Sequence, residues 1–445
     1  MEIRAERALL PDGWAERVRV TLEGDRIVAV APDDAPGPRV ACLLPGMANL
    51  HSHAFQRGFS GLTEARGPGT DSFWTWREMM YRFARSLTPD EAEAIAAMAY
   101  AEMLESGYTH VGEFHYLHHA PDGGPYDDPA EMSARIFAAA AATGIALTHL
   151  PVFYAHGGFG GAAVGAGQRR FLHDINGFAR LVERCDALRR PGDVVGIAPH
   201  SLRAVTTAEL RQLAQDHAGR PVHIHVAEQH REVEDCLAFS GRRPVELLFD
   251  TVAPGPDWCL IHATHLVPSE ITALAGSGAV AGLCPITEAN LGDGLFAAPA
   301  FLAAGGAFGI GTDSNVEIAL AGELRLLEYG ARLSGRVRNA LALAEGSTGE
   351  ALFRQALAGG ARALGAAAAG IAPGAVADLV ALADPLDLSV TGPQMLDRWV
   401  FGQDLRVETV WSRGRPVVSE GRHIARDAIV RDFSRAVAAV LERQG

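Results

Sequence analysis

Cysteine is scarce in this sequence, and no two cysteines are spaced for binding a metal together. Only five occur among 445 residues, widely scattered, odd in number and without a Cys-x-x-Cys pair. This pattern is typical of a reducing compartment and argues against a cysteine zinc cluster. We therefore expect a cytoplasmic protein.

Long hydrophobic runs are also missing. The most apolar long segment, residues 136–150, is shorter than the ~20 residues that a membrane span needs, and small or polar residues interrupt it. The first residues of the chain carry no apolar core followed by a cleavage site. We predict neither a membrane span nor a secretory signal.

The sequence has fewer basic than acidic residues. Lys and Arg together number 39 against 53 Asp and Glu, which gives a net charge of -14 at pH 7. This balance argues against nucleic acid or an anionic membrane as a partner, although a local positive pocket is compatible with it. The length, the 48% hydrophobic content and the 49 glycines describe a globular chain with one large domain and a smaller one.

Both ends of the chain are predicted to form β structure. Residues 1–45 contain short strand-like stretches that alternate polar and apolar side chains around a Glu-Gly-Asp turn. Similar stretches return at 377–383, 407–412 and 414–418. We predict that residues 1–45 and 370–425 form one small β-sandwich domain.

The middle of the chain alternates short apolar runs with longer helical segments. Eight such runs occur, at 43–50, 108–114, 145–154, 193–198, 221–227, 258–263, 278–284 and 307–312. Eight strands alternating with helices predict a parallel (β/α)8 barrel, here over residues 46–369. A doubly wound sheet is the alternative, but it does not require eight strands with polar residues at so many strand ends.

Some helices are marked by their ends. Thr88, Pro89 and Glu91 form a capping box with proline in the first turn, and Gly107 ends that helix. Further helices are expected at 322–333 and 348–364. The last segment, 426–445, has apolar residues at helical spacing and is predicted to dock on the surface.

Two histidines, His51 and His53, end the first apolar run. Their i, i+2 spacing places both imidazoles on one face of a strand, which makes half of a divalent-metal site. In a barrel the active site lies at the carboxyl ends of the strands. Four further candidates stand at the ends of runs four, five, six and eight: His200, His225, His262 and Asp313.

This set of residues resembles the amidohydrolase superfamily over nearly the whole chain. The matching features are His-x-His after strand one, His after strands five and six, Asp after strand eight, the split β domain and Gly374-Ala-Val-Ala-Asp-Leu-Val380. Run four ends without a lysine that could be carbamylated to bridge two metals, as in the mononuclear deaminase branch. The resemblance implies one Zn²⁺ ion held by His51, His53, His225 and Asp313.

The choice of His225 over its neighbour His223 needs a reason, because both point to the same face of the strand. In the resembling branch an acid/base glutamate follows the metal histidine by three residues, and only His225 has one, Glu228. His223 is expected to line the site or to support it from behind.

The expected reaction is hydrolytic deamination. Zinc makes hydroxide available near neutral pH, and Asp313 takes the proton from water. His262 orients the water and stabilises the developing charge, while Glu228 protonates the departing nitrogen.

Further phrases resemble the N-formimidoyl-L-glutamate deiminase family within this superfamily. They are His53-Ala-Phe-Gln-Arg57, Phe73-Trp-Thr-Trp-Arg-Glu78, Gly112-Glu-Phe-His-Tyr-Leu-His118, Ala198-Pro-His-Ser-Leu-Arg203 and Cys284-Pro-Ile-Thr-Glu-Ala-Asn-Leu-Gly-Asp-Gly294. The resemblance implies hydrolysis of the formimidoyl group to N-formyl-L-glutamate and ammonia, as in histidine degradation. It also implies the substrate-binding residues Gln56, Arg77, Tyr116, His200 and Arg203.

The chemistry of a dicarboxylate amidine agrees with two of these residues. Guanidinium groups bind carboxylates through paired hydrogen bonds. Arg203 follows a strand end beside the candidate metal ligands, and Arg77 lies in a segment long enough to fold over the site as a lid. The glycine-rich residues 157–167 are expected to form a mobile rim of the barrel mouth.

The sequence also leaves alternative functions open. A related deaminase of the same mechanism could act on a cyclic amidine such as a nucleobase, and a barrel without chemistry could serve as a scaffold. Iron or manganese could replace zinc under other conditions. The expected assembly is a homodimer.

Overall fold

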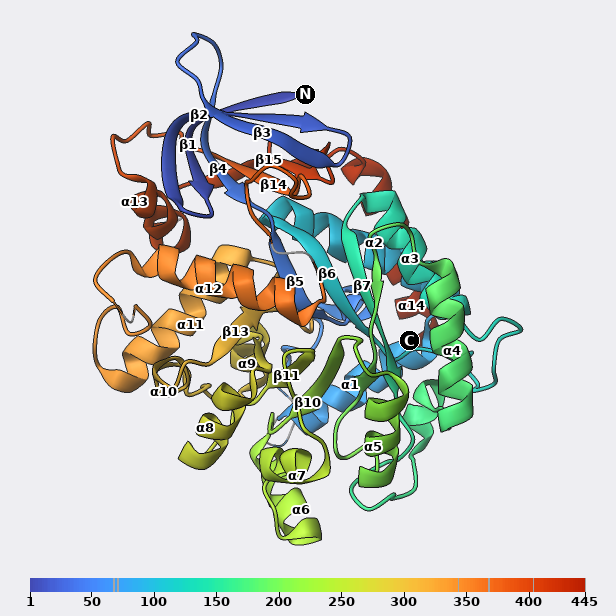
Figure 1. Cartoon of the computed structure of the whole chain (residues 1–445). Helices are drawn as coiled ribbons and strands as arrows, with labels where there is room; N and C mark the ends of the chain where they lie inside the picture. Colours follow the sequence, from blue (N-terminus) through green and yellow to red (C-terminus); the bar gives the residue numbers. More distant parts are fainter. Residues whose placement is uncertain (67–68, 70–71, 343, 367–368, 403, 445) are drawn as a thin grey trace.

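The computed structural model describes residues 1–66, 69, 72–342, 344–366, 369–402 and 404–444. Figure 1 shows two parts, a small β-sheet at the top and a larger part below in which helices surround parallel strands. The boundaries of the two predicted domains stay a prediction.

The small part is one eight-stranded sheet in the order β17-β16-β15-β14-β4-β1-β2-β3. The pairing of β4 with β14, which places Leu43 opposite Ala381, joins the two ends of the chain as predicted. The strands are β1 (Glu2–Leu10), β2 (Gly13–Glu23), β3 (Arg26–Pro32), β4 (Val40–Pro45), β14 (Leu379–Ala383), β15 (Arg406–Ser412), β16 (Arg415–Ser419) and β17 (Arg422–His423).

This sheet folds back on itself. The edge strand β3 accepts and donates hydrogen bonds with the segment before β14: Ile27 N donates to Ala375 O at 2.9 Å, and Gly374 N donates to Ile27 O at 2.7 Å. A separate apolar core fills the enclosed space. The hydrogen bonding therefore makes one continuous eight-stranded sheet around this core, and the β-sandwich arrangement of the small domain stays a prediction.

The larger part contains two parallel sheets, and each of the eight predicted apolar runs overlaps one of their strands. The first sheet consists of β5 (Met47–Ser52), β6 (Tyr108–His115), β7 (Ala146–Phe153), β8 (Val194–Val195) and β9 (Ala198–Pro199). The second consists of β10 (Val222–Val226), β11 (Trp258–His262), β12 (Val280–Leu283) and β13 (Ala307–Ile310). Both sheets keep the order of the chain, whereas a doubly wound sheet reverses its strand order.

Isolated parallel bridges link the two sheets at both of their edges. Ser52 pairs with Asp313 on one side, and Ser201 pairs with His225 on the other. The interior between the sheets is filled by apolar side chains that include Leu50, Ile261 and Leu364. The interior is therefore packed below the strand ends, which leaves the carboxyl ends of the strands as the place for a site.

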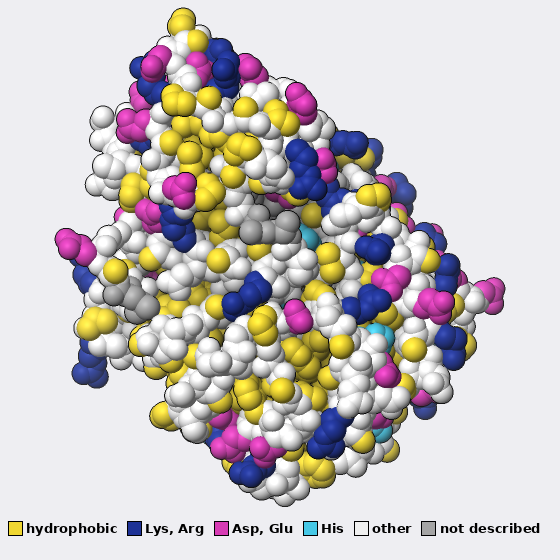
Figure 2. Space-filling view, viewed as in Figure 1, with side chains coloured by type: hydrophobic (Ala, Val, Ile, Leu, Met, Phe, Trp, Pro, Cys, Tyr) yellow, Lys and Arg dark blue, Asp and Glu magenta, His cyan; other side chains and the backbone are white. Residues whose placement is uncertain are grey.

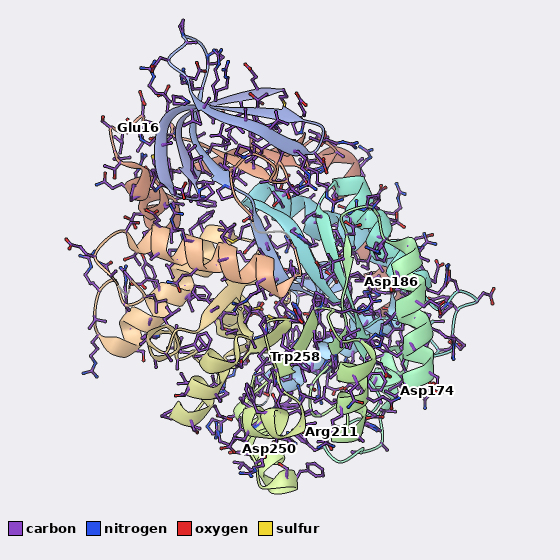
Figure 3. The ribbon with its side chains drawn as sticks, in the orientation of Figure 1. Glu16, Asp174, Asp186, Arg211, Asp250 and Trp258 are labelled. Atoms are coloured by element: carbon purple, nitrogen blue, oxygen red, sulfur yellow. The ribbon has the colours of Figure 1, made fainter. Side chains whose placement is uncertain are left out.

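Helices cover the outside of these strands. The helix predicted from its capping box is α2, in which Glu91 N donates to Thr88 Oγ1 at 3.4 Å and Thr88 N donates to Glu91 Oε2 at 2.9 Å. Figure 3 shows Asp186 on the outlying helix α4 and Asp174, which caps the start of that helix, with Trp258 nearer the centre. The helical segments are η1 (Ala54–Phe59), α1 (Phe73–Ser86), α2 (Pro89–Ser106), α3 (Glu131–Thr143), η2 (Ala166–Phe171), α4 (Ile175–Leu188), α5 (Thr207–Asp216), α6 (His230–Ser240), α7 (Pro244–Thr251), α8 (Pro268–Ser277), α9 (Pro285–Leu291), α10 (Ala298–Ala303), α11 (Leu320–Gly335), α12 (Thr348–Ala363), α13 (Gly392–Asp397), η3 (Arg398–Gly402) and α14 (Arg426–Gln444).

The C-terminal helix α14 packs against α1 and α2, as its apolar spacing predicted. Arg443 binds Glu91 at 2.6 Å, and Arg426 binds Glu105 at 3.0 Å. Residue 445, which the prediction included in this helix, lies outside the described residues. Arg443 also donates to Ser86 O at the end of α1 at 3.0 Å, so the helix supports both α2 and α1, and α1 contributes residues to the candidate site.

The surface agrees with the mixed composition. On the face shown in Figure 2, basic and acidic side chains are interspersed with apolar ones. In the described part of the chain, no helix combines the length and the apolar character that crossing a membrane requires.

Gly359 on α12 tests how tightly that helix packs on β13. A side chain there would meet the carbonyl of Phe308 directly, so Gly359→Ala should lower the free energy of unfolding by about 1–3 kcal/mol despite alanine's better helix propensity. Gly276 on α8 is the matched control, since open space surrounds it and Gly276→Ala should stabilise by up to about 1 kcal/mol. Chemical denaturation measures the change in the free energy of unfolding of each variant. Equal changes in Gly359→Ala and Gly276→Ala would contradict the packing argument.

Candidate metal centre and active site

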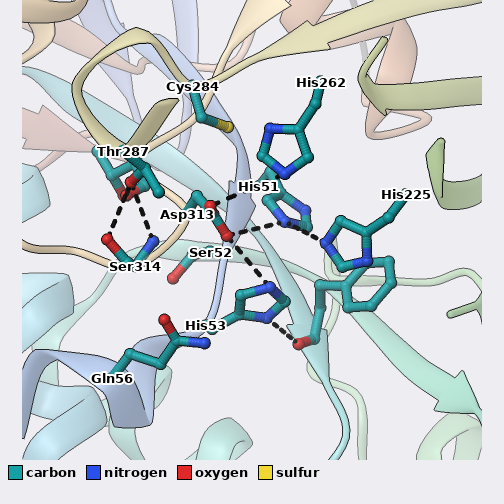
Figure 4. Close-up of polar contacts among 12 residues, drawn as sticks. His51, Ser52, His53, Gln56, His225, His262, Cys284, Thr287, Asp313 and Ser314 are labelled. Atoms are coloured by element: carbon teal, nitrogen blue, oxygen red, sulfur yellow. Dashed lines mark hydrogen bonds and ion pairs between the residues drawn. The ribbon is translucent and has the colours of Figure 1, made fainter. Parts of the chain in front are cut away.

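Four of the predicted ligands converge at the carboxyl ends of β5, β10 and β13 (Figure 4). His51 Nε2 lies 3.1 Å from His225 Nε2 and 3.2 Å from Asp313 Oδ1, and His53 Nε2 also lies 3.2 Å from Asp313 Oδ1. All four residues are buried, and one ligand atom from each lies within 4.8 Å of the others. The sequence predicted this set of four, and the structure brings its members together.

The orientation of the imidazoles fits a bound cation. His53 Nδ1 donates to Phe114 O at 2.8 Å, and His225 Nδ1 donates to His200 O at 3.1 Å, so their Nε2 lone pairs point into the cluster. Burial lowers the pKa of His51 to about 3, which keeps its ring neutral. Neutral imidazole nitrogens and a carboxylate directed at one point repel each other unless a metal ion lies between them.

A buried polar network holds β5 against the end of β13. Asn49 Nδ2 donates to Thr312 Oγ1 at 2.7 Å, and Thr312 Oγ1 donates to Asn315 Oδ1 at 2.6 Å. Asn315 Nδ2 in turn donates to Ser52 Oγ at 3.2 Å. Sequence reasoning missed these supports, although an asparagine inside an apolar strand run was a signal, because a buried amide needs polar partners.

His223 belongs to the packed interior and not to the metal cluster. Its Nε2 donates to Ala363 O at 2.8 Å, where the end of α12 closes the interior below the site. Burial lowers the pKa of His223 to about 4, so the ring is neutral. This contact agrees with the preference for His225, and His223 supports the packed interior between the two parallel sheets without lining the cavity described below.

His262 ends β11 in a left-handed conformation, with a φ of 67°. Its Nδ1 donates to Glu288 Oε1 at 3.2 Å, which directs Nε2 toward Glu228 at 3.7 Å and Asp313 at 3.9 Å. Burial alone would lower the pKa of His262, but these surrounding carboxylates outweigh burial and raise the pKa to about 10. Sequence reasoning missed Glu288, which lies 26 residues from the histidine that it orients.

Glu228 follows β10 on a second left-handed turn, in which Ala227 has a φ of 53°. The carboxylate of Glu232 accepts hydrogen bonds from Ala227 N at 3.3 Å and Glu228 N at 3.1 Å. Burial raises the pKa of Glu228, so its carboxyl holds a proton more readily than an exposed glutamate does. Glu232 was a second support that the sequence did not reveal.

The predicted substrate-binding residues and the acid/base candidates share one cavity of about 60 Å³. Every predicted site residue except His51 lines it, and helix α1 covers it with Phe73, Trp76, Arg77 and Met80. The expected lid segment also contains residues 67, 68, 70 and 71, which lie outside the described residues. The prediction that residues around Arg77 fold over the site is confirmed for α1.

The neutral side chains of the cavity are fixed by one another. Gln56 Nε2 donates to Tyr116 Oη at 2.8 Å, while Gln56 Oε1 is buried without a partner in the described chain. His200 Nδ1 lies 3.1 Å from Ser201 Oγ, and burial holds the pKa of His200 well below its usual range. The free amide oxygen is therefore available to a ligand N–H group.

Two guanidinium groups supply positive charge to the same cavity. Arg203 lies 4.0 Å from Glu228 Oε2, and Arg77 has no carboxylate within ion-pair distance among the residues described. The Nε atoms of both arginines are buried without hydrogen-bond partners in this part of the chain. A ligand with carboxylate groups would satisfy these donors.

The glycine-rich segment lies at the mouth of the site, as predicted. Gly157, Gly158 and Phe159 line an outer cavity of about 430 Å³ together with Arg77 and Arg203. The position at the rim is observed, and the mobility of this segment stays a prediction.

The fold and the cluster define a class: metal-dependent hydrolases that carry their ligands at the ends of parallel strands. The family profile described as "Amidohydrolase family" matches residues 42–417, and the profile "Formimidoylglutamate deiminase HutF, N-terminal domain" matches residues 2–39. The chain belongs to the amidohydrolase family.

Individual relatives agree with this assignment. Formimidoylglutamate deiminase of Pseudomonas aeruginosa is 50% identical over 450 residues, which cover 99% of each chain. An amidohydrolase from Brucella melitensis has a solved structure with 54% identity, a TM-score of 0.97 and 99% coverage of both chains. An adenosine deaminase from Xanthomonas campestris, solved with bound zinc, has 24% identity and a TM-score of 0.81, covers 99% of this chain and 98% of its own, and shows the fold alone.

Metal analysis tests the cluster directly. His225→Ala removes one of the converging nitrogens, so the purified variant should lose at least about tenfold in metal affinity. His223→Asn is the matched control two residues away on the same strand, and it should keep its metal because its partner is a backbone carbonyl outside the cluster. Metal retained by His225→Ala and lost by His223→Asn would reverse the assignment.

Proposed function

We propose that this protein hydrolyses N-formimidoyl-L-glutamate to N-formyl-L-glutamate and ammonia, a step in histidine degradation. The observation that carries the proposal is one cavity that combines the three-histidine, one-aspartate cluster with two arginines whose Nε atoms are buried without hydrogen-bond partners in the described chain. The full-length relationship to a formimidoylglutamate deiminase supports the same reaction.

The substrate carries an amidine at one end and two carboxylates at the other. Its carboxylates bind Arg77 and Arg203, since a planar guanidinium donates two parallel hydrogen bonds to one carboxylate. Gln56, Tyr116 and His200 supply neutral hydrogen bonds along the connecting chain. Glu228, the proposed proton donor, lies 4.0 Å from Arg203, so the amidine and a carboxylate of the substrate bind in neighbouring parts of the cavity.

The proposed cofactor is one zinc ion held by His51, His53, His225 and Asp313. Three imidazole nitrogens and a carboxylate oxygen are a donor set that zinc favours. The sequence contains no lysine at any position, so the carbamylated lysine that would bridge a second metal cannot form. When bound, the ion acts as a Lewis acid that makes hydroxide available near neutral pH.

The side chains then divide the proton transfers. Asp313 accepts the proton that water loses as its oxygen bonds to the amidine carbon, and His262, oriented by Glu288, donates a hydrogen bond that stabilises the developing charge. Glu228 delivers a proton to the terminal nitrogen, the C–N bond breaks, and ammonia leaves. The new C–O bond becomes the carbonyl of the formyl group. One amidine and one water molecule are thus converted to one formamide and one ammonia molecule.

Several broader features belong to the same proposal. The bridges between the two parallel sheets support a closed (β/α)8 barrel over residues 46–369, beside a small domain from 1–45 and 370–425 and a C-terminal helix at 426–445. We propose a cytoplasmic homodimer without nucleic-acid or membrane partners. Five buried free cysteines support the reducing compartment, and the acidic net charge supports the absence of nucleic-acid and anionic-membrane partners.

A cyclic amidine is the second candidate substrate, because aromatic rings line much of the cavity. Trp76, Tyr154 and Phe171 are among its walls, and such rings can stack on a nucleobase. A scaffold without chemistry is less well supported, since such a protein needs no converging metal ligands.

Ammonia release tests the reaction. Purified zinc-loaded protein should release ammonia from N-formimidoyl-L-glutamate, and Asp313→Ala should lose at least about 10³-fold in kcat because it removes a ligand and the proton acceptor. Activity in the variant equal to that of the parent would rule out the assigned mechanism. An inactive parent with full zinc would redirect the search to cyclic amidines, and an inactive parent without zinc would favour the scaffold.

A second prediction separates the two substrate classes. Arg203→Met keeps the length of the side chain but removes the guanidinium, so kcat/KM for the dicarboxylate should fall by about 10²–10³-fold. Turnover of a cyclic amidine depends less on this charge and should change much less. Kinetics on both substrates decide between them, and an unchanged KM for the dicarboxylate would contradict the role of Arg203.

A further inference from the structure

The indole of Trp74 lies against three guanidinium groups at the mouth of the site. The ζ carbons of Arg77, Arg231 and Arg203 lie 4.4, 4.9 and 5.9 Å from its ring centroid. Such distances are within the range of attractive cation–π contacts. The three arginines come from α1, from the start of α6 and from the turn after β9, so one ring joins three separate elements.

Trp74 is outside the inner cavity. It lines the outer cavity of about 430 Å³ together with its three arginines, while the inner cavity is lined by Arg77 and Arg203 but not by Trp74. The indole therefore contacts the lining of the inner cavity through these two guanidinium groups and through the ring of Phe73, whose centroid lies 5.2 Å from that of Trp74.

An aromatic face can hold several guanidinium groups close together and still leave their N–H donors free, which a carboxylate cannot do. Guanidinium groups brought together repel each other, and something must offset that repulsion before the ligand arrives. Carboxylates offset part of it, since Glu228 lies 4.0 Å from Arg203 and Asp235 lies 3.7 Å from Arg231. A carboxylate in closer contact would also occupy the N–H donors of these arginines and cancel their charge. The π face of an indole attracts the cations and leaves the donors at the edges of Arg77 and Arg203 free, in agreement with their unpartnered Nε atoms.

We propose that Trp74 is a positioning residue that determines specificity: it holds Arg77 and Arg203 as a preformed receptor for two carboxylates. Trp74 thus sets the preference for a dicarboxylate amidine over one with a single carboxylate. This inference rests on the proposed function, because it assumes a substrate with two carboxylates.

The test compares two substrates in zinc-loaded wild type and Trp74→Leu. One substrate is N-formimidoyl-L-glutamate, and the other is N-formimidoyl-4-aminobutyrate, which lacks the α-carboxylate. In Trp74→Leu the KM for the dicarboxylate should rise about tenfold while kcat stays within about threefold, and the preference for the dicarboxylate should fall about tenfold. Trp74→Phe keeps a π face and should recover most of the preference.

Trp14→Leu in the small sheet is the matched control and should leave both KM values unchanged. A loss in kcat alone, or an equal rise of both KM values in Trp74→Leu, would overturn the proposal. Thermal unfolding and zinc content of each variant exclude general damage, and Trp74→Phe serves where Trp74→Leu does not fold.

Binding of glutarate by calorimetry separates this proposal from the proposed function. If the wild type converts neither substrate, the affinity for glutarate still measures how well Arg77 and Arg203 bind two carboxylates. About tenfold weaker glutarate binding in Trp74→Leu would then support Trp74 although the reaction is wrong. Equal binding in both proteins, or no binding by the wild type, would overturn the role of Trp74.

Discussion

The site depends on the close approach of two strands from opposite ends of the parallel part, β5 and β13. A Cβ atom on Gly311 would meet the backbone of His51, so this approach requires glycine. Asn49 and Thr312 then bond the strands through side chains, which brings the two histidines of β5 to Asp313. The resulting cluster directs lone pairs at one point in a buried place, so the fold and the cation are mutually dependent: the strands create the repulsion, and a metal ion removes it.

Several residues around the metal cluster have a strained backbone that neighbouring side chains stabilise. Ala227, His262 and Asp313 all have positive φ without being glycine, a conformation that costs energy and persists only where the surroundings enforce it. Two buried carboxylates, Glu232 and Glu288, stabilise this conformation at the turns of Ala227 and His262. Glu232 accepts hydrogen bonds from the amides of Ala227 and Glu228, and Glu288 accepts one from the ring of His262. The backbone at Glu228 and the ring of His262 are therefore each held by a carboxylate, and in the proposed reaction their geometry is set before a ligand arrives.

Charge is distributed in a way that the net value conceals. The chain carries -14 overall, yet its cavity presents the guanidinium groups of Arg77 and Arg203 together with His262, whose pKa is raised to about 10. Arginine suits both contacts of these side chains, since a flat guanidinium can stack on an indole and still donate along its edge, whereas an ammonium group is a point charge. Stacking and carboxylate binding therefore use different parts of one group.

The sequence by itself determined the eight apolar runs that overlap the parallel strands and the small sheet from both termini, because such runs are local patterns, and the resemblance to a known family added the set of four metal ligands. It predicted a β-sandwich for the small domain but not its strand pairing, since the pairing of Leu43 with Ala381 involves residues far apart in the chain. Nor could it settle His223, whose partner is a carbonyl on α12, or reveal Glu288 and Trp74. The position of a residue along a strand determines the face of the sheet to which its side chain points. Only tertiary packing determines which residues, distant in the sequence, contact it on that face.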